Sequence, residues 1–392
     1  MGDLKCSIVI PYKQRLDNIK VVFASLADQT MDSSQFEVVV GAMEYSNEYV
    51  SVCQEYADRV NIVTVMSAEP WNAQRARNLA IRHATGEVLI VLDADMVVPA
   101  DFLENLYDRH FQHGQDLCVV GQMIGYDEVH ATHIDTVEVL PYSHYRKTLD
   151  ELATTDRSRL DMRWSEEWSP ALTRFPWAFA RTALMALRLE TFREHDLWLD
   201  EGFDGWGAED QEWGFRIAMS GTPLVFAEDV YAIHLPHKRD LAVNGEEARI
   251  TNRYYLAKWP RLDLELAIEF GWLDTDRCYP EVERELAGAV SGPGRALGVV
   301  RGRIEGRDTL VVGAEIDPES RTPVAEVDAL FDPRSSLEVL PLAGFALPYE
   351  DSAVDVCRVL PAVGRLSERY RKPVLREAGR VSRELLTPTG LG

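Results

Sequence analysis

The first hundred residues alternate short apolar runs with stretches of helical character, and this alternation most constrains the fold. Runs rich in Val, Ile and Leu predict buried strands at residues 6–11, 36–40, 61–66 and 87–92. Helices are predicted between them at residues 17–29 and 72–84. Nearly continuous apolar strands separated by helices are typical of a parallel sheet that is covered on both faces. The pattern therefore predicts an α/β fold whose ligands bind at the carboxyl ends of the strands.

The charge of the chain excludes one class of partner. The 392 residues carry a formal charge of −23, and most of the acidic excess falls on residues 1–280. A broad surface for nucleic acid or anionic membrane needs clustered positive side chains. We therefore expect no nucleic-acid partner.

Cysteine usage and hydropathy predict the compartment. The chain has five cysteines, widely spread and without a CxxC pair, which is typical of reduced thiols. No run approaches the roughly 18 apolar residues of a membrane-spanning helix, and the stretch before the first strand is too short for a signal peptide. We expect a cytoplasmic protein with no transmembrane segment.

Two carboxylates follow the fourth predicted strand. Asp93 and Asp95 come directly after residues 87–92, and side chains two apart at a strand end point the same way. Paired oxygen ligands there suit Mg²⁺ or Mn²⁺ bridging a diphosphate. The alternative is a solvated acidic pair that caps the next turn.

Further blocks of polar and aromatic residues flank this pair. They are IPYKQR at residues 10–15, AQRARN at 73–78, LDEGFDGWGAEDQE at 199–212 and YAIHLPH at 231–237. The first block ends a predicted strand and offers an aromatic ring and two cations to a nucleobase and a pyrophosphate. The second opens a helix just before the acidic strand end.

In this order and spacing, the blocks resemble the GT-A glycosyltransferases of the family 2 type. The later blocks are also similar to the β-1,4-galactosyltransferases, the bacterial chondroitin polymerases and the polypeptide N-acetylgalactosaminyltransferases. The resemblance covers roughly residues 5–240. It implies a GT-A, Rossmann-like catalytic domain with a mainly parallel sheet, a UDP-sugar donor, and Mn²⁺ or Mg²⁺ as the cofactor.

The resemblance also implies a donor and metal site. The implied donor-binding residues are Pro11, Tyr12, Arg15, Arg77, Asn78 and Asp93. The acidic turn that such enzymes carry after the second strand is missing, and only Glu44 could take its place beside the uridine. Asp95, assisted by Asp93, would bind the metal together with a histidine. That histidine is His234, after the last catalytic strand, or His237, in a block at residues 237–240 similar to the "HSRD" of galactosyltransferases.

The "GWGxED" block supplies an acceptor site. Glycines beside Trp206 permit a tight turn that presents the indole as a platform, and Gly207 belongs to this turn. Glu209 and Asp210 then occupy the first turn of a helix predicted to reach residue 219, where the helix dipole favours ionised carboxyls. The resemblance makes Asp210 the general base and Glu209 a partner of the acceptor. The alternative is a helix start enriched in acids and a Trp that packs in the core.

The implied reaction is a single displacement with inversion at the anomeric carbon. The acceptor stays open: a polysaccharide, a peptide, a lipid-linked sugar or a small molecule. A rival hypothesis is a non-catalytic protein that binds sugar nucleotides or glycans and uses its second domain for assembly. A base such as Asp210 beside a metal site speaks against it, because a binding module needs no base.

Residues beyond 290 predict a second, smaller domain. We expect a catalytic domain at 1–240, a helical extension and linker at 241–290, and a further domain at 295–392. Strands at 308–312 and 325–330 and a helix at 370–385 resemble the middle of a class I methyltransferase. The cofactor loop is reduced to Gly313 and the closing strands are missing, so this domain is expected to be incomplete, Rossmann-like and used for packing or homo-oligomer formation. A bifunctional glycosyl and methyl transferase is the remaining rival.

Overall fold

The structure is a computed structural model that describes residues 4–125, 138–157, 160–238 and 240–388. The chain divides into two compact units, Met1–Ala248 and Arg249–Gly392. The division falls inside one long helix, α10 (Leu241–Lys258).

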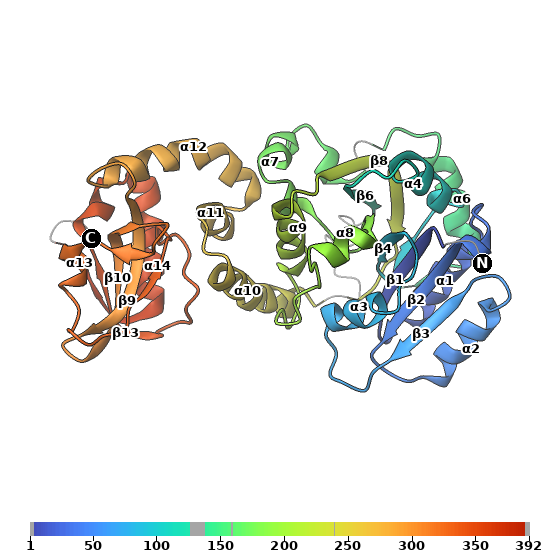
Figure 1. Cartoon of the computed structure of the whole chain (residues 1–392), viewed down its shortest axis with the longest axis horizontal. Helices are drawn as coiled ribbons and strands as arrows, with labels where there is room; N and C mark the ends of the chain where they lie inside the picture. The colour runs from blue at the N-terminus through green and yellow to red at the C-terminus, as the bar shows by residue number, and fades with distance from the viewer. Residues whose placement is uncertain (1–3, 126–137, 158–159, 239, 389–392) are drawn as a thin grey trace. The chain divides into compact units, whose positions relative to one another are not determined.

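The first unit is built on an eight-stranded mixed sheet with the order β3-β2-β1-β4-β7-β6-β8-β5 (Figure 1). Its strands are β1 (Cys6–Tyr12), β2 (Phe36–Ala42), β3 (Ile62–Met66), β4 (Val88–Leu92), β5 (Met96–Val97), β6 (Cys118–Ile124), β7 (Leu184–Arg188) and β8 (Leu224–His234). Strands β1 to β4 pair in parallel, whereas β7 runs antiparallel to both of its neighbours. The predicted α/β class is confirmed, with its parallel half where the apolar runs were found.

Helices connect these strands. They are α1 (Leu16–Leu26), η1 (Ser33–Gln35), α2 (Asn47–Tyr56), α3 (Ala73–Ile81), α4 (Phe102–His110), α6 (Tyr142–Leu152), η2 (Met162–Trp164), α7 (Ser169–Arg174), η3 (Pro176–Phe179), α8 (Leu189–Glu194) and α9 (Glu209–Met219). The predicted helices at residues 17–29 and 72–84 correspond to α1 and α3. In the segment that links β6 to β7, the described residues are helical or irregular.

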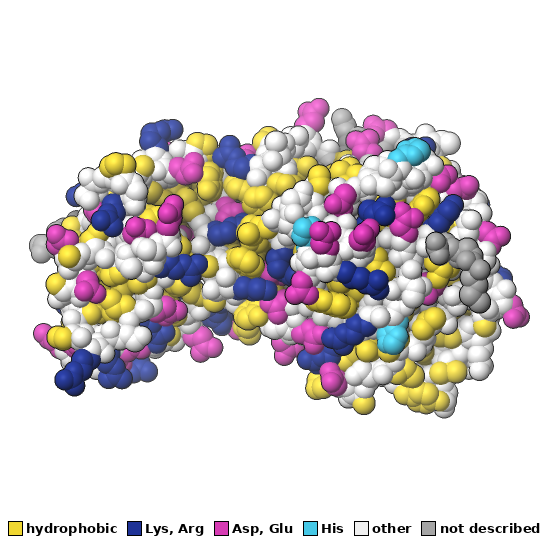
Figure 2. Space-filling model, in the orientation of Figure 1, with side chains coloured by type: hydrophobic (Ala, Val, Ile, Leu, Met, Phe, Trp, Pro, Cys, Tyr) yellow, Lys and Arg dark blue, Asp and Glu magenta, His cyan; other side chains and the backbone are white. Residues whose placement is uncertain are grey.

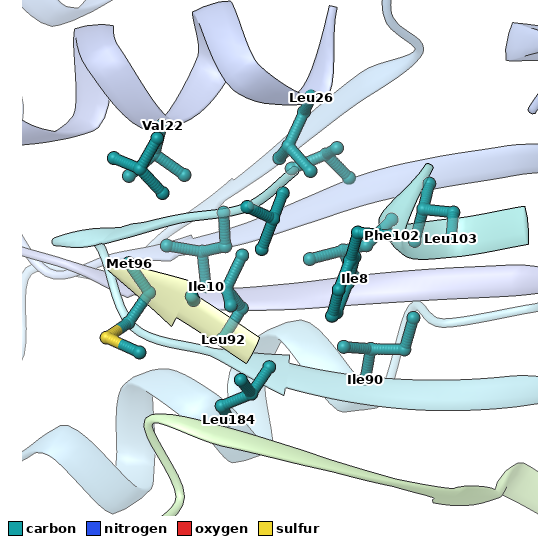
Figure 3. Packing of buried hydrophobic residues seen from close by; sticks show 14 of the residues in the cluster. Ile8, Ile10, Val22, Leu26, Ile90, Leu92, Met96, Phe102, Leu103 and Leu184 are labelled. Atoms are coloured by element: carbon teal, nitrogen blue, oxygen red, sulfur yellow. The ribbon is translucent and has the colours of Figure 1, made fainter. Parts of the chain in front are cut away.

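Both faces of the parallel half are covered. Alternate residues of β1, such as Ile8 and Ile10, pack with α1, α2 and α4 in one cluster, and Figure 3 shows Ile8, Ile10 and Leu92 beside Val22 and Leu26 of α1. The intervening residue Val9 packs with α3, α8 and α9 in a second cluster. Burial on both faces explains why these strands read as continuous apolar runs.

The second unit contains a six-stranded mixed sheet with the main order β12-β9-β10-β13-β14. Its strands are β9 (Ala296–Ile304), β10 (Arg307–Asp317), β11 (Thr322–Pro323), β12 (Glu338–Leu340), β13 (Val354–Val359) and β14 (Ser382–Leu386). Besides part of α10, its helices are α11 (Leu262–Phe270), α12 (Trp272–Ala289), α13 (Ala325–Asp328), η4 (Pro361–Arg365) and α14 (Glu368–Val381). Glu305 and Gly306, both with positive φ, form the two-residue hairpin turn between β9 and β10.

Two predictions for this unit are wrong. Residues 325–330 were expected to be a strand, but residues 325–328 form the short helix α13. Its Glu and Asp residues are poor strand formers. The helix expected at residues 370–385 ends at Val381, and its last residues instead form β14, which pairs in parallel with β13. Sheet pairing there outweighs local helix propensity.

No helix among the described residues is long and apolar enough to cross a membrane. On the face drawn in Figure 2, Lys and Arg are interspersed with Asp and Glu, without a continuous basic surface.

A buried glycine at the end of β2 gives a stability test. A Cβ at Gly41 would lie 1.9 Å from the carbonyl oxygen of Ala76 in α3, and backbone cannot move away cheaply. We predict that Gly41→Ala lowers the free energy of unfolding by roughly 2 kcal/mol or more, seen as a lower Tm in a thermal melt.

The matched control is Gly245→Ala in α10, where a Cβ meets nothing within 4 Å. This change should leave the Tm equal or slightly higher, because alanine is the better helix former. Equal melting of both variants and the wild type would contradict the close packing of α3 on β2.

Candidate active site

The acidic pair lies in a tight turn where β4 ends. The backbone N–H of Asp93 donates to the carbonyl of Ala183 (3.1 Å), and the N–H of Met96 donates to the carbonyl of Asp93 (3.2 Å). The turn leads straight into β5 and leaves the Asp95 side chain 2% exposed. The sequence prediction that both carboxylates line one site is matched by the geometry, since both border the same pocket.

Strand pairing brings two histidines to Asp95. In the antiparallel pair β5–β8, Met96 lies opposite His234, and the N–H of Leu235 donates to the carbonyl of Asp95 (2.8 Å). Asp95 Oδ2 lies 3.8 Å from His234 Nε2 and 3.4 Å from His237 Nε2. The candidate ligand atoms of Asp95, His234 and His237 all lie within 4.8 Å of one another.

These three residues have the donor set of a divalent metal site. The structure brings both histidines to the carboxylate, so the two alternatives of the sequence converge on one cluster. Mg²⁺ is bound in proteins mainly by oxygen, whereas imidazole suits transition metals. Two imidazole nitrogens beside one carboxylate form a mixed donor set that fits a divalent metal ion. Arg239, in the same sequence block as His237, lies outside the described residues.

Arg15 lies next to this cluster. Arg15 is the residue before α1, and its guanidinium donates to Asp95 Oδ2. Its Nη2 also approaches His237 Nδ1 at 3.4 Å. The side chain is 40% exposed, so it has room to swing towards a ligand. The guanidinium places a positive charge beside Asp95.

Arg77 takes the corresponding place beside the other carboxylate. It is buried at 4% exposure, and its Nη2 donates to Asp93 Oδ1 (2.7 Å) while Nη1 donates to Gln74 (3.0 Å). Burial raises the pKa of Asp93, with the charge of Asp95 adding to the shift and Arg77 opposing it. Arg77 therefore holds Asp93 at the pocket wall.

Three expected donor residues lie away from the pocket wall. Tyr12 is buried and stacks on Tyr49, with ring centroids 4.3 Å apart. Asn78 is buried and bonds both the N–H and the carbonyl of Leu199, so it connects α3 to the loop before the GWGxED block. Glu44 accepts the backbone N–H of Gln14 (2.6 Å). Among the described residues, these contacts give the three side chains structural roles.

The GWGxED block forms the expected turn. Gly205 (φ 122°), Gly207 (φ 101°) and Ala208 (φ 67°) have positive φ, a conformation that glycine adopts without cost. The turn presents Trp206 at 42% exposure. Its backbone N–H donates to Glu247 of α10 (2.8 Å), which ties the turn to α10, and Trp206 lines the pocket.

Helix α9 begins at the second acidic pair. Burial, and next the charge of Asp210, raise the pKa of Glu209 to about 8, and Glu209 Oε2 is buried without a hydrogen-bond partner in the described part of the chain. Asp210 instead accepts a hydrogen bond from the hydroxyl of Thr182 on Oδ1. The adjacent carboxyls thus have different environments, and Glu209 keeps its proton at neutral pH.

One pocket of about 460 Å³ collects these groups. The expected site residues that line it are Pro11, Arg15, Arg77, Asp93, Asp95, Trp206, Glu209, Asp210, His234 and His237. Residues that the sequence prediction missed also line it, among them Trp71, Arg181, Asp240 and Glu247. Trp71 directly precedes the AQRARN block, a signal that could have been used. Arg181 and Glu247 carry no local motif and reach the pocket only through tertiary folding.

The first part of the chain matches the model of a known protein family. Residues 7–164 match the model described as Glycosyl transferase family 2. This segment contains β1 to β4, the acidic turn, Arg15 and Arg77. The match falls on the family that the motifs predicted.

Named relatives agree with this class. The chain is 26% identical to Validoxylamine A glucosyltransferase of Streptomyces hygroscopicus subsp. jinggangensis over 287 residues, 71% of this chain and 66% of the relative. It is 26% identical to Chondroitin synthase of Pasteurella multocida over 228 residues, 55% of this chain and 23% of the relative. The matches thus span less than two thirds of these relatives' length. A solved mannosyltransferase from Pyrobaculum calidifontis, in complex with GDP-Man and Mn²⁺, is similar at a TM-score of 0.46, with 17% identity and coverage of 74% of this chain and 77% of that chain.

The protonated state of Glu209 gives a pH test. Between the ordinary pKa of a Glu and about 8, the folded state binds a proton that the unfolded chain has lost, so this residue makes stability fall as pH rises. We predict that Glu209→Gln raises the Tm of the first unit by about 3 °C or more at pH 8, with little difference at pH 4.5.

The comparison isolates this residue. Glu265 in α11 also has a pKa raised to about 8 by burial, but it is present in both proteins and cancels in the difference. A Tm difference that stays constant from pH 4.5 to pH 8 would contradict the buried, proton-holding state of Glu209.

Proposed function

We propose that the protein is a metal-dependent, inverting glycosyltransferase that moves a sugar from a UDP-sugar to an acceptor hydroxyl. One observation carries the proposal: the cluster of Asp95, His234 and His237 borders the same pocket as the pair Glu209 and Asp210. Glycosyl transfer needs a group that binds the donor diphosphate and a base that takes the acceptor proton. The metal-ligand set and the candidate base that share this pocket match these two requirements.

The proposed site for the sugar donor consists of the three candidate metal ligands and two arginines. Asp95, His234 and His237 would hold the ion, which lowers the charge of the donor diphosphate and of the departing nucleotide. Arg15 and Arg77 line the same part of the pocket and offer guanidinium donors that suit phosphate oxygens. Since the chain is strongly acidic, these local positive charges are what draws a diphosphate into the site.

Asp210 fits the general base. The hydroxyl of Thr182 occupies its Oδ1, which leaves Oδ2 to take the proton of the acceptor hydroxyl. That oxygen then attacks the anomeric carbon as the bond to the diphosphate oxygen breaks on the opposite face, and the configuration inverts. Glu209, which holds its proton at neutral pH, donates a hydrogen bond to the acceptor, and Trp206 provides an exposed apolar surface for a sugar ring.

The transferred sugar and the acceptor are proposed as chemical classes. Two of the relatives are named as a glucosyltransferase and a chondroitin synthase, and the GWGxED block is similar to that of galactosyltransferases. We propose a hexose or N-acetylhexosamine of the gluco or galacto series as the transferred sugar. The acceptor class is a hydroxylated ligand that stacks on Trp206.

The backbone around Gly313 in the second unit speaks against methyl transfer. Gly313, expected in a cofactor loop, lies at a bulge inside β10, which continues to Asp317 paired with β9. A Cβ at Gly313 would meet the side chain of Val363 at 2.5 Å, so this backbone is packed against protein. A continuous strand leaves no loop for a nucleoside cofactor at this position.

The donor and base assignments have a direct test. The protein is incubated with Mn²⁺ and a panel of UDP-sugars, beginning with UDP-glucose, and UDP release is measured with and without EDTA. We predict release with at least one donor, abolished by EDTA, and a loss of roughly 10²-fold to 10⁴-fold in Asp210→Asn, the range that general-base catalysis supplies.

The matched control for this experiment is Asp196→Asn. Asp196 is exposed and has a positive φ of 51° that asparagine also adopts. The Asp196→Asn variant should therefore release UDP at the rate of the wild type. Undiminished release in Asp210→Asn would overturn the base assignment. Release that is indifferent to EDTA would overturn the metal.

The place of Arg15 gives a second test, by metal binding. Because its guanidinium bonds Asp95 in the structure, a metal ion must displace it. We predict that Arg15→Gln binds Mn²⁺ roughly tenfold more tightly than the wild type without nucleotide, about 1.4 kcal/mol, but binds UDP more weakly when Mn²⁺ is present. Calorimetry measures both affinities.

Arg59→Gln, a change at an exposed arginine that lies on the Tyr56 ring, should alter neither affinity. Unchanged or weaker Mn²⁺ binding in Arg15→Gln would show that Arg15 does not compete for the metal site.

A further inference from the structure

A three-residue segment before β7 contacts both halves of the pocket. Arg181, Thr182 and Ala183 lie directly before β7, and Leu184 of β7 pairs with Leu92 of β4. Extending this antiparallel register places Ala183 beside Asp93, where its carbonyl accepts the Asp93 N–H (3.1 Å). The segment is therefore fixed to the turn after β4 that carries Asp95, the candidate metal ligand.

The same segment holds the start of α9. Thr182 is 1% exposed, and its hydroxyl donates to Asp210 Oδ1. The preceding residue, Arg181, lines the pocket and has its Nη1 fixed by the carbonyls of Ala178 (3.2 Å) and Ala180 (2.6 Å). Its charge opposes the rise in the pKa of Glu209, behind burial and the charge of Asp210.

A second contact fixes α9 against residues just upstream of this segment. At Gly214 of α9, a Cβ would lie 2.5 Å from Ala180 Cβ and 3.0 Å from the carbonyl oxygen of Trp177. Only a glycine permits this approach, so the middle of α9 packs directly on residues 177–180. The helix is thus held at its first turn by Thr182 and in its middle by this packing.

We propose that Thr182 is a positioning residue for the general base, and that residues 181–183 set the position of Asp210 relative to Asp93 and Asp95. The inference rests on the proposed function, in which Asp210 takes the acceptor proton. Thr182 touches no reacting atom. It acts by holding Oδ1 of Asp210 in a fixed direction. The other carboxylate oxygen of Asp210 then points into the pocket at a set distance from the candidate metal ligands.

The physical reason is that the base and the metal lie on different parts of the fold. Asp95 follows β4, whereas Asp210 follows a glycine-rich turn with positive φ values. Without a fixed contact, rotation about the Asp210 side chain would spread its free oxygen over several positions. A misplacement of about 1 Å can cost a hundredfold in rate, and a hydrogen bond to a charged group is strong enough to prevent it.

The test uses one variant that keeps the shape of the side chain and one that keeps its hydroxyl. Thr182→Val removes the hydroxyl and keeps the shape, whereas Thr182→Ser keeps the hydroxyl. With the UDP-sugar of the panel that the wild type turns over fastest, and water as the acceptor, we expect kcat for UDP release to fall roughly tenfold to a hundredfold in Thr182→Val. We expect Thr182→Ser to stay within about threefold of the wild type. The donor KM and the calorimetric affinities for Mn²⁺ and UDP should be unchanged in both.

A double-mutant cycle separates positioning from general damage. In the Asp210→Asn background, Thr182→Val should change the rate less than about twofold, because the two residues act as one unit. The same tenfold or larger loss in both backgrounds would overturn the proposal, as would a wild-type rate in Thr182→Val. If Thr182→Val does not fold, Thr182→Ala gives the same comparison.

The outcomes distinguish this proposal from the function on which it rests. UDP release by the wild type that is lost in Asp210→Asn but retained in Thr182→Val overturns the positioning role alone. No release from any donor of the panel overturns the proposed function, and the positioning role with it.

Discussion

The candidate site depends on the antiparallel pairing of β5 with β8. Two residue pairs, Met96 with His234 and Val97 with Ile233, join segments about 140 positions apart in the sequence. The bond from Leu235 N–H to the Asp95 carbonyl extends this ladder, and His234 and His237 are carried to the Asp95 carboxylate by it. Backbone register thereby fixes Asp95 and His234, two members of the candidate metal-ligand set, and His237 follows three residues after β8.

Electrostatics then determines what the pocket can hold. Two carboxylates at the β4 turn are each paired with an arginine: the buried Asp95 with Arg15, and the partly exposed Asp93 with Arg77. The pocket therefore offers positive charge to a diphosphate although the chain as a whole carries −23. In the same pocket, burial raises the pKa of Glu209 to about 8, and Asp210 accepts a hydrogen bond from the Thr182 hydroxyl. The proposed donor and acceptor groups therefore differ in charge within one cavity.

Much of this could be predicted from the sequence, and the rest depends on tertiary contacts. The apolar runs identified the parallel strands because burial on both faces leaves no polar alternation, and the motifs named Asp95, His234, Trp206 and Asp210, which all border one pocket. Tyr12 and Asn78 were expected at the same site, but both are buried away from the pocket wall. A motif does not show which side chains are buried by packing. Thr182 and Glu247 carry no motif, because they reach the site only through the β7 register and α10. In the second unit, local propensity failed at residues 325–330 and at β14, where sheet pairing decides the structure.

The most direct measurement is a crystal structure of the protein with Mn²⁺ and UDP, with anomalous data collected to locate the metal. The account predicts an anomalous peak within bonding distance of Asp95 and at least one of His234 and His237, with Arg15 moved from Asp95 to the diphosphate. A nucleotide bound with no metal at this cluster, or a metal held elsewhere in the pocket while Arg15 still bonds Asp95, would contradict it.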